Sequence, residues 1–226
     1  AAIGAVNAVA FDISAACAGF IFAMNIVEGF FKAGIYKTAL IIGAETLSKV
    51  TDWSDRGTCV LFGDGAGAAV LKAEETGIID MMMGADGTKG DVLACTSRTV
   101  GNFLTGTKPE LGFMTMDGQE VFKFAVRKVP ESVMELLQRT GTKKEDIKYY
   151  VLHQANERII EAAARRLKEP MEKFPMTISQ FGNTSTASIP LLLDDMIRKD
   201  MLKRGDKIIM SGFGAGMTWG AVLMEW

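Results

Sequence analysis

Short apolar runs of strand length alternate with longer segments of helical pattern, and this alternation favours folds in which helices cover a sheet. Residues 6–13, VNAVAFDI, predict a buried strand, and residues 18–33 predict a mostly apolar helix with Gly34 beyond its end. Residues 37–45, KTALIIGAE, contain the continuous apolar run of a strand that is covered on both faces. We therefore predict an α/β fold.

The second half of the chain repeats this order. A helix is predicted over residues 118–141, and Pro130 after Val129 indicates a break or a new first turn within it. The remaining predicted elements are a strand running into a loop, an amphipathic helix with an apolar face, a further helix, and two strands joined by a glycine turn: 147–156, 157–168 (apolar face Ile159, Ile160, Ala163, Leu167), 189–202 and 206–226.

A glycine-rich sequence precedes an Ala-Val-Leu strand twice, as FGDGAGAAVL at 62–71 and FGAGMTWGAVL at 213–223. This echo fits two similar αβ halves packed together, and it equally fits glycine hairpins that recur by chance. The first copy opens into a strand and lacks a Gly-Lys-Ser/Thr sequence, which argues against a phosphate-binding loop.

Composition limits the class of protein. With 226 residues, 48% of them hydrophobic and 23% charged, the chain can bury a sizeable core. The net charge of −2 and the absence of a long Lys/Arg cluster argue against nucleic acid as a partner. No apolar run reaches membrane-spanning length, and the first residues lack the basic flank of a signal peptide. We therefore expect a cytoplasmic protein that binds neither nucleic acid nor membrane.

The cysteine and histidine content disfavours a disulfide framework and a metal site. Cys17, Cys59 and Cys95 are odd in number and far apart, and the chain has one histidine. The chain also begins without methionine, in what resembles the tail of a helix, so we expect it to be part of a longer polypeptide.

Three polar residues follow strands or precede helices and could do chemistry. Cys17 lies between a strand-like and a helix-like segment, where free backbone N–H groups and the helix dipole favour a thiolate, although a lone cysteine is more often a small buried hydrophobe. His153 follows an apolar strand and is either a ligand-facing imidazole or a hydrogen-bonded loop residue. Asn183 either caps the next helix or presents its amide to a substrate. Together they supply the nucleophile, donor and amide that acyl-thioester chemistry requires.

Five motifs then resemble one family, in the same order and over the whole chain. The motifs DISAACAGF, DRGTCVLFGDGAGAAVL, VLHQANERII, FGNTSTASIP and SGFGAGMTWGAVL are similar to those of β-ketoacyl-acyl-carrier-protein synthase III, the initiating condensing enzyme of bacterial fatty acid synthesis. The resemblance implies a thiolase fold, with two similar αβ halves in a layered αβαβα arrangement. Residues 1–80 would be the remainder of the N-terminal half with the nucleophile, and residues 81–226 the C-terminal half with His153 and Asn183.

The sequence also departs from the family. The family's chain is longer at its N-terminus by about one small αβ subregion, so we expect that segment to have been removed or to be present as a separate piece. A chain without it is not expected to fold alone, because residues 6–13 would lose neighbouring strands. Ala215 stands where many relatives have a third glycine, and Thr186 where alanine is common.

The resemblance implies an acyltransferase that makes 3-oxoacyl-acyl-carrier protein from an acyl-coenzyme A primer and malonyl-acyl-carrier protein. Cys17 would form an S-acyl intermediate, with the backbone N–H groups of Cys17 and Ala215 holding the oxyanion. His153 Nε2 and the Asn183 amide would stabilise the enolate left by decarboxylation. No metal or redox cofactor is needed in this scheme, and relatives are homodimers.

The resemblance assigns binding residues as well. Arg56 and Gly57 match the segment that contacts the coenzyme A nucleotide. Arg158 matches a basic residue that attracts the acidic carrier protein, or it is an ordinary solvated helix arginine. The predicted walls of the pantetheine tunnel are Met116, Gly118, Phe122, Ala155 and Asn156.

Other functions use similar residues. A starter-unit condensing enzyme of polyketide or quinolone biosynthesis would keep the same triad. GNTSTASIP disfavours chalcone-synthase-like enzymes and hydroxymethylglutaryl-coenzyme A synthase. A papain-like hydrolase also uses Cys, His and Asn, but its cysteine signature is missing here. A non-catalytic homologue would tolerate loss of one of the three residues, and all three are present.

Overall fold

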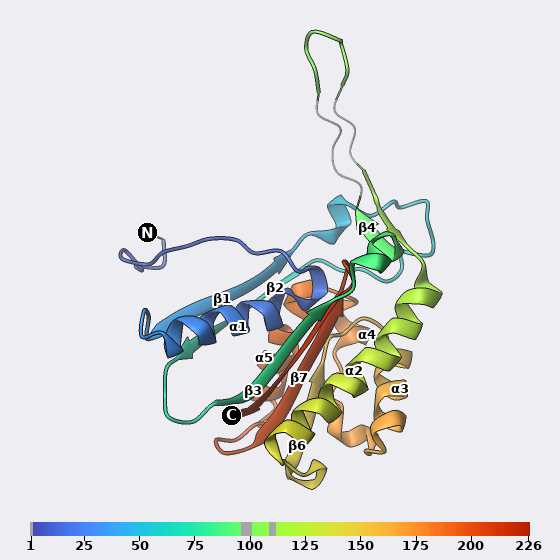
Figure 1. Ribbon diagram of the computed structural model, residues 1–226. Helices are drawn as coiled ribbons and strands as arrows, with labels where there is room; N and C mark the ends of the chain where they lie inside the picture. The colour runs from blue at the N-terminus through green and yellow to red at the C-terminus, as the bar shows by residue number, and fades with distance from the viewer. Residues whose placement is uncertain (1, 96–100, 109–111) are drawn as a thin grey trace.

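The computed structural model describes residues 2–95, 101–108 and 112–226, which form a mixed α/β structure (Figure 1). Its central sheet has the strand order β3-β8-β7-β6, with β6 parallel to β7 and the other pairs antiparallel. A second sheet pairs β1 with β2. The strands are β1 Thr38–Glu45, β2 Gly65–Lys72, β3 Ile78–Ala85, β4 Leu93–Cys95, β5 Met114–Met116, β6 Ile147–Leu152, β7 Lys207–Gly214 and β8 Thr218–Glu225.

Helices lie on both faces of the central sheet. Alternate residues of β7 separate the two cores, because Ile209 packs with helices α2 and α3 whereas Ile208 packs with α1 and α5. The α-helices are α1 Gly19–Lys32, α2 Gly118–Thr140, α3 Glu157–Leu167, α4 Ile178–Phe181 and α5 Ser188–Arg198. The 3₁₀ helices are η1 Ala16–Ala18, η2 Leu47–Lys49, η3 Gly87–Val92, η4 Lys144–Asp146, η5 Met171–Lys173 and η6 Ser185–Ala187.

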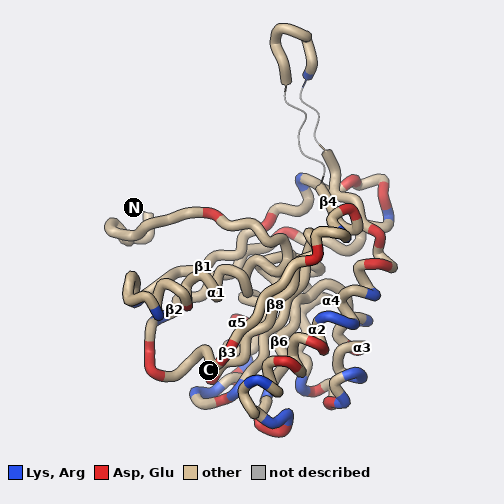
Figure 2. The backbone as a smooth tube through the Cα atoms, in the orientation of Figure 1, with Lys and Arg blue, Asp and Glu red and all other residues tan. Residues whose placement is uncertain are grey.

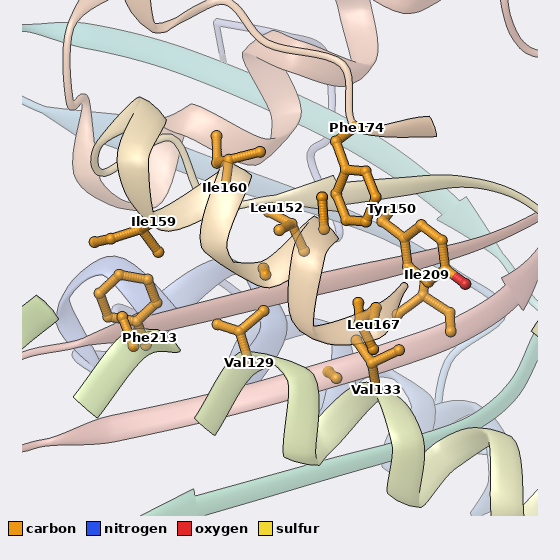
Figure 3. Packing of buried hydrophobic residues seen from close by; sticks show 14 of the residues in the cluster. Val129, Val133, Tyr150, Leu152, Ile159, Ile160, Leu167, Phe174, Ile209 and Phe213 are labelled. Carbon is orange, nitrogen blue, oxygen red and sulfur yellow. The ribbon is translucent and has the colours of Figure 1, made fainter. Parts of the chain in front are cut away.

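The core between α2, α3 and the central sheet is the larger of the two apolar clusters. Figure 3 shows Val129 and Val133 of α2 facing Leu167 of α3, with Tyr150 stacked on Phe174 beside them. The ring centroids of Tyr150 and Phe174 are 4.8 Å apart. These contacts fix α3 against the end of β6, which sets the position of the loop that follows β6.

One face of the β1–β2 sheet packs against α1 and α5, and its other face is exposed. Four layers therefore occur: α2 with α3, the central sheet, α1 with α5, and the β1–β2 sheet. Ile41 is buried against α1 and α5, whereas Leu40, Ile42 and Val70 are 44%, 60% and 73% exposed. The expectation that residues 37–45 are covered on both faces is therefore wrong for the described residues. Figure 2 shows that charged residues are frequent along α2, α3 and the loops near them, and that β1 and β2 carry few.

Most predicted elements are confirmed, including the helices at 18–33 and 157–168, the strand at 37–45 and the final pair of strands. The buried strand predicted at 6–13 is wrong, because these residues are exposed and pair with none of the described strands. The helix predicted to continue to residue 202 ends at Arg198. No helix among the described residues is long and apolar enough to span a membrane. The division between residues 80 and 81 falls inside β3 and stays a prediction.

The predicted break at Val129-Pro130 is wrong, because α2 runs unbroken through both residues. Proline has no N–H, so the carbonyl of Val126 four residues earlier loses its helical partner. Arg166 of α3 donates from Nη1 to that carbonyl at 3.2 Å. Asp117 caps the first turn of the helix, and Gly141 ends it at φ 66°.

Candidate active site

A cavity of about 100 Å³ lies where η1, the loop after β6, the end of β7 and the start of α2 meet. It brings together Cys17, His153 and Asn183, which come from three separate parts of the sequence. Its remaining lining residues are Leu61, Phe62, Leu93, Met116, Gly118, Val121, Phe122, Ala155, Asn156, Ile159, Phe213 and Gly214. The lining is mostly apolar with a few polar groups, which is the usual composition of a small-molecule site.

Cys17 lies in a constrained turn just before α1. Ala16 has φ 47°, a left-handed conformation that is uncommon for a residue with a β-carbon. Two threonine hydroxyls hold this turn: Thr186 Oγ1 donates to the Ala16 carbonyl at 2.7 Å, and Thr218 Oγ1 donates to the Ala15 carbonyl at 3.1 Å. The left-handed residue and these two bonds fix where the sulfur points.

The thiol of Cys17 is protonated in the resting protein. Burial raises its pKa to about 11, because a thiolate would be poorly solvated there, and the negative charge of Glu45 acts in the same direction. A hydrogen bond from Ser185 lowers the pKa by less than burial raises it. The expectation of a thiolate-favouring position is therefore wrong in its electrostatics, although Cys17 does precede a helix as predicted.

His153 follows β6 and is almost completely buried. Its backbone N–H donates to the Ser211 carbonyl at 2.8 Å, and its Nδ1 lies 2.6 Å from Ser188 Oγ. The ring meets Phe213 edge to face, with the centroids 5.4 Å apart. Burial lowers the pKa of His153 to about 3, so the imidazole is neutral at pH 7. A neutral imidazole with this pKa is a hydrogen-bond donor or acceptor and a weak base.

Asn183 is held so that its amino group is the one left for the cavity. Its side-chain Oδ1 accepts from the Ser185 N–H at 2.9 Å, and its backbone is fixed by bonds with Leu61 and Gly63. The oxygen is occupied, so the Nδ2 amino group is available to donate. The capping alternative is wrong, because the N-cap of α5 is Ala187 and no side chain among the described residues caps that helix; the Asn183 oxygen serves the preceding turn instead.

Glycines allow the end of β7 to approach the cysteine turn. A β-carbon on Gly214 would lie 2.5 Å from the Cys17 nitrogen, and one on Gly212 would lie 3.3 Å from the Cys17 oxygen. Ala215 follows Gly214, and its carbonyl shares the Thr218 hydroxyl proton with the Ala15 carbonyl, each oxygen being 3.1 Å from Thr218 Oγ1. Ala215 does not line the cavity.

The other predicted residues divide into two groups. Met116, Gly118, Phe122, Ala155 and Asn156 all line the cavity. Arg56 and Gly57 do not; they lie in an exposed loop, where Asp55 Oδ1 accepts from the Gly57 N–H at 2.8 Å. Arg158 is exposed in the first turn of α3, and its backbone N–H donates to Asn156 Oδ1.

Part of the site was not predicted from the sequence. Ser185 contacts Cys17, and Ser188 contacts His153. Both serines lie in the motif FGNTSTASIP, and this closeness in sequence to Asn183 could have indicated that they belong to the site. Gly214 lies in the glycine turn that the sequence singled out, next to Ala215. No pattern in the sequence distinguishes the apolar lining residues from ordinary core residues: Leu61, Phe62, Leu93, Val121, Ile159 and Phe213. Within the described ranges, no group of three or more His, Cys, Asp or Glu residues could hold a metal ion.

Comparisons with known proteins identify a family that matches most of the chain. The family model for 3-oxoacyl-[acyl-carrier-protein (ACP)] synthase III matches residues 11–87, and the model for the C-terminal part of that enzyme matches residues 137–226. The β-ketoacyl-[acyl-carrier-protein] synthase III of Clostridium acetobutylicum is 51% identical over 226 residues, which are 99% of this chain and 70% of the relative.

Solved structures are similar over the same extent. The 3-oxoacyl-[acyl-carrier-protein] synthase III of Aquifex aeolicus superposes with a TM-score of 0.91 at 44% identity, covering 100% of this chain and 70% of that one. The enzyme of the same name from Pseudomonas aeruginosa superposes with a TM-score of 0.93 at 39% identity, covering 99% and 70%. The expected thiolase fold is thereby confirmed, and the described residues form four of the five expected layers.

Proposed function

The chain belongs to the 3-oxoacyl-[acyl-carrier-protein] synthase III family, and from this premise we propose that it condenses an acyl-coenzyme A primer with malonyl-acyl-carrier protein. The product is a 3-oxoacyl-acyl-carrier protein, and the reaction initiates fatty acid synthesis. The observation that carries this proposal is the cavity that brings the thiol of Cys17 together with the side chains of His153 and Asn183.

The first half-reaction transfers the acyl group to Cys17. The sulfur attacks the thioester carbonyl, the coenzyme A sulfur leaves, and the thiol proton ends on the released coenzyme A. Backbone N–H groups of Cys17 and Ala215 hold the oxyanion in this proposal. With a pKa of about 3, His153 is a weak acceptor for the thiol proton. We therefore propose that His153 acts in condensation and not as the base that deprotonates Cys17.

The second half-reaction uses the two donors. Malonyl-acyl-carrier protein loses carbon dioxide, and the enolate oxygen accepts hydrogen bonds from His153 Nε2 and the Asn183 amino group. The enolate carbon attacks the acyl-Cys17 carbonyl, and the product leaves with the carrier. The released thiolate takes a proton from solvent, which its raised pKa favours. The carbon–carbon bond is driven by decarboxylation, so we propose no metal or redox cofactor.

Substrate contacts follow from the positions of the predicted residues. The five tunnel residues line the same cavity as Cys17, which supports their assignment to the pantetheine arm. Arg56 and Gly57 are exposed, as a segment that contacts the coenzyme A nucleotide must be. Arg158 is exposed on α3 and is proposed to attract the acidic carrier protein. We further propose a cytoplasmic homodimer, as the resemblance implies.

The relatives favour this activity over that of a polyketide or quinolone starter enzyme. The test is intact-mass analysis after incubation with acetyl- or branched-acyl-coenzyme A. An acyl adduct that Cys17→Ser abolishes and that malonyl-acyl-carrier protein discharges with formation of a 3-oxoacyl product supports the proposal. Discharge by water without a condensed product would indicate a hydrolase and overturn it.

A further inference from the structure

Ser188, the first residue of α5, lies directly behind the imidazole of His153. Its Oγ is 2.6 Å from His153 Nδ1 and 3.3 Å from the backbone nitrogen of Gln154. Ser188 is 2% exposed and does not line the cavity. Its hydroxyl therefore acts on the site through the histidine and not through direct contact with a substrate.

The hydrogen bonds around Ser188 determine where its proton points. A serine hydroxyl has one proton and two acceptor lone pairs, and the backbone N–H of Gln154 can only donate. The hydroxyl therefore accepts from Gln154 and has its own proton left to donate. Within the part of the chain that the structure describes, the other hydrogen-bonding neighbour of this hydroxyl is Nδ1 of His153.

A hydroxyl that donates to Nδ1 leaves that nitrogen without a proton. The neutral imidazole then carries its proton on Nε2. The opposite tautomer would place two donors, Gln154 N–H and His153 Nδ1–H, on one serine oxygen and would leave a buried hydroxyl proton unsatisfied. That arrangement is the costlier one.

The frame around Ser188 is itself fixed. Gln154 Nε2 donates to the Leu152 carbonyl at 2.8 Å, and Gln154 Oε1 accepts from the Thr177 N–H at 2.9 Å. Gln154 is buried, so its backbone N–H holds a constant direction toward Ser188. Phe213 restrains the imidazole ring from the side.

We propose that Ser188 is a positioning residue that fixes His153 in the Nε2–H tautomer and so directs one N–H donor into the cavity. The catalytic consequence rests on the proposed function, in which this donor serves the enolate. The tautomer itself does not depend on any reaction.

The direct test is nuclear magnetic resonance of the full-length protein labelled with ¹⁵N in the imidazole, at pH 7. His153 is the one histidine of these 226 residues, and comparison with His153→Asn identifies its signals. We expect a protonated Nε2 and an unprotonated Nδ1. In Ser188→Ala, we expect a second population with the proton on Nδ1, and in Ser188→Thr, which keeps the hydroxyl, a return to the single tautomer. A wild-type ring protonated on Nδ1 would overturn the proposal.

Kinetics provide the second readout. We expect Ser188→Ala to slow condensation by about tenfold, as loss of a residue that orients a site group does, and to leave acylation of Cys17 within about twofold. The matched control is Ser132→Ala, which removes another buried hydroxyl, bonded at 2.8 Å to the Lys128 carbonyl of α2. Equal effects of the two variants, or an unchanged tautomer in Ser188→Ala, would count against a positioning role. Absence of any acyl adduct on the wild-type chain would refute the proposed function and leave the tautomer result standing.

Discussion

The α-carbon of Gly214 lies so close to Cys17 that an added β-carbon would be 2.5 Å from the Cys17 nitrogen and 3.1 Å from the Ala18 nitrogen. Both neighbours are backbone atoms, so a side chain cannot relieve the clash. The absence of a side chain at Gly214 therefore lets the turn that carries Cys17 pack directly on the end of β7.

Gly214→Ala is therefore expected to displace the turn of Cys17 and to reduce its acylation by about a hundredfold or more, because displacement of about 1 Å at a reacting group has such an effect. The rate of adduct formation by mass spectrometry measures this. Gly87→Ala is the control, since nothing lies within 4 Å of a β-carbon there. Equal acylation of the two variants would refute the role given to this contact.

Asn183→Ala should slow condensation much more than acylation. The Asn183 oxygen serves the local turn, and its amino group supplies one of the two proposed enolate donors. Loss of such a donor costs about 2.7–4 kcal/mol of transition-state stabilisation. Single-turnover measurement of each half-reaction separates the two steps. Blocked acylation with intact condensation would reverse the proposed roles.

His153 should make stability fall in acid. Its pKa is lowered from 6.5 to about 3 by burial, so the unfolded chain binds a proton below pH 6.5 that the folded chain does not. The stability of the neutral ring is fully present above pH 6.5 and is lost at about 1.4 kcal/mol per pH unit as pH falls toward 3. Urea unfolding of wild type and His153→Asn at pH 7.5, 6, 5 and 4 tests this. Parallel stability curves would contradict it.

Arg166→Ala should destabilise the protein by about 1 kcal/mol, because it leaves the Val126 carbonyl opposite Pro130 without its donor. Arg165→Ala is the control on the same helix, since Arg165 is 71% exposed and pairs weakly with Glu161 at 3.7 Å; it should have little effect. In a Pro130→Ala background, the restored N–H at position 130 can bond the Val126 carbonyl, so Arg166→Ala should lower the free energy of unfolding by less. Equal costs in both backgrounds would show that Arg166 acts elsewhere.

Arg158→Ala should raise the KM for malonyl-acyl-carrier protein by about threefold to fivefold at low salt, because an exposed charge contributes little more than this. The effect should shrink as ionic strength rises, since screening weakens steering between charged surfaces. Malonyl-coenzyme A as the second substrate should show no change. A salt-independent KM would identify Arg158 as an ordinary solvated helix residue.

The sequence predicted those parts of the fold that local pattern determines. The long apolar run at 18–33 and the amphipathic pattern at 157–168 were predicted to be helices and form helices. The strand β3 was not predicted, because its methionine-rich sequence shows neither the helical nor the alternating strand pattern. Its partner β8 also lies at the far end of the chain. Residues 6–13 have strand-like composition, but a strand also needs neighbours to bond with.

The site was predictable in its parts and not in its electrostatics. The identity of Cys17, His153 and Asn183 followed from motifs, and the cavity contains all three. The protonated resting thiol could not be predicted, because helix-terminal position is local whereas burial is a property of the packed fold. The partner of His153 Nδ1 likewise depends on how α5 packs against β6.

The hydroxyls that hold the turn before Cys17 come from distant parts of the chain. Thr218 and Ala15 are 203 positions apart, and Thr186 and Ala16 are 170 apart. Contacts between such distant residues close large loops and therefore form slowly during folding. The nucleophile is accordingly the first residue of its site to be synthesised and among the last to acquire its working geometry. The rate at which Cys17 becomes acylated should thus follow the completion of folding. In chains that have not yet formed β8, Thr218 does not hold the turn, and Cys17 would not react.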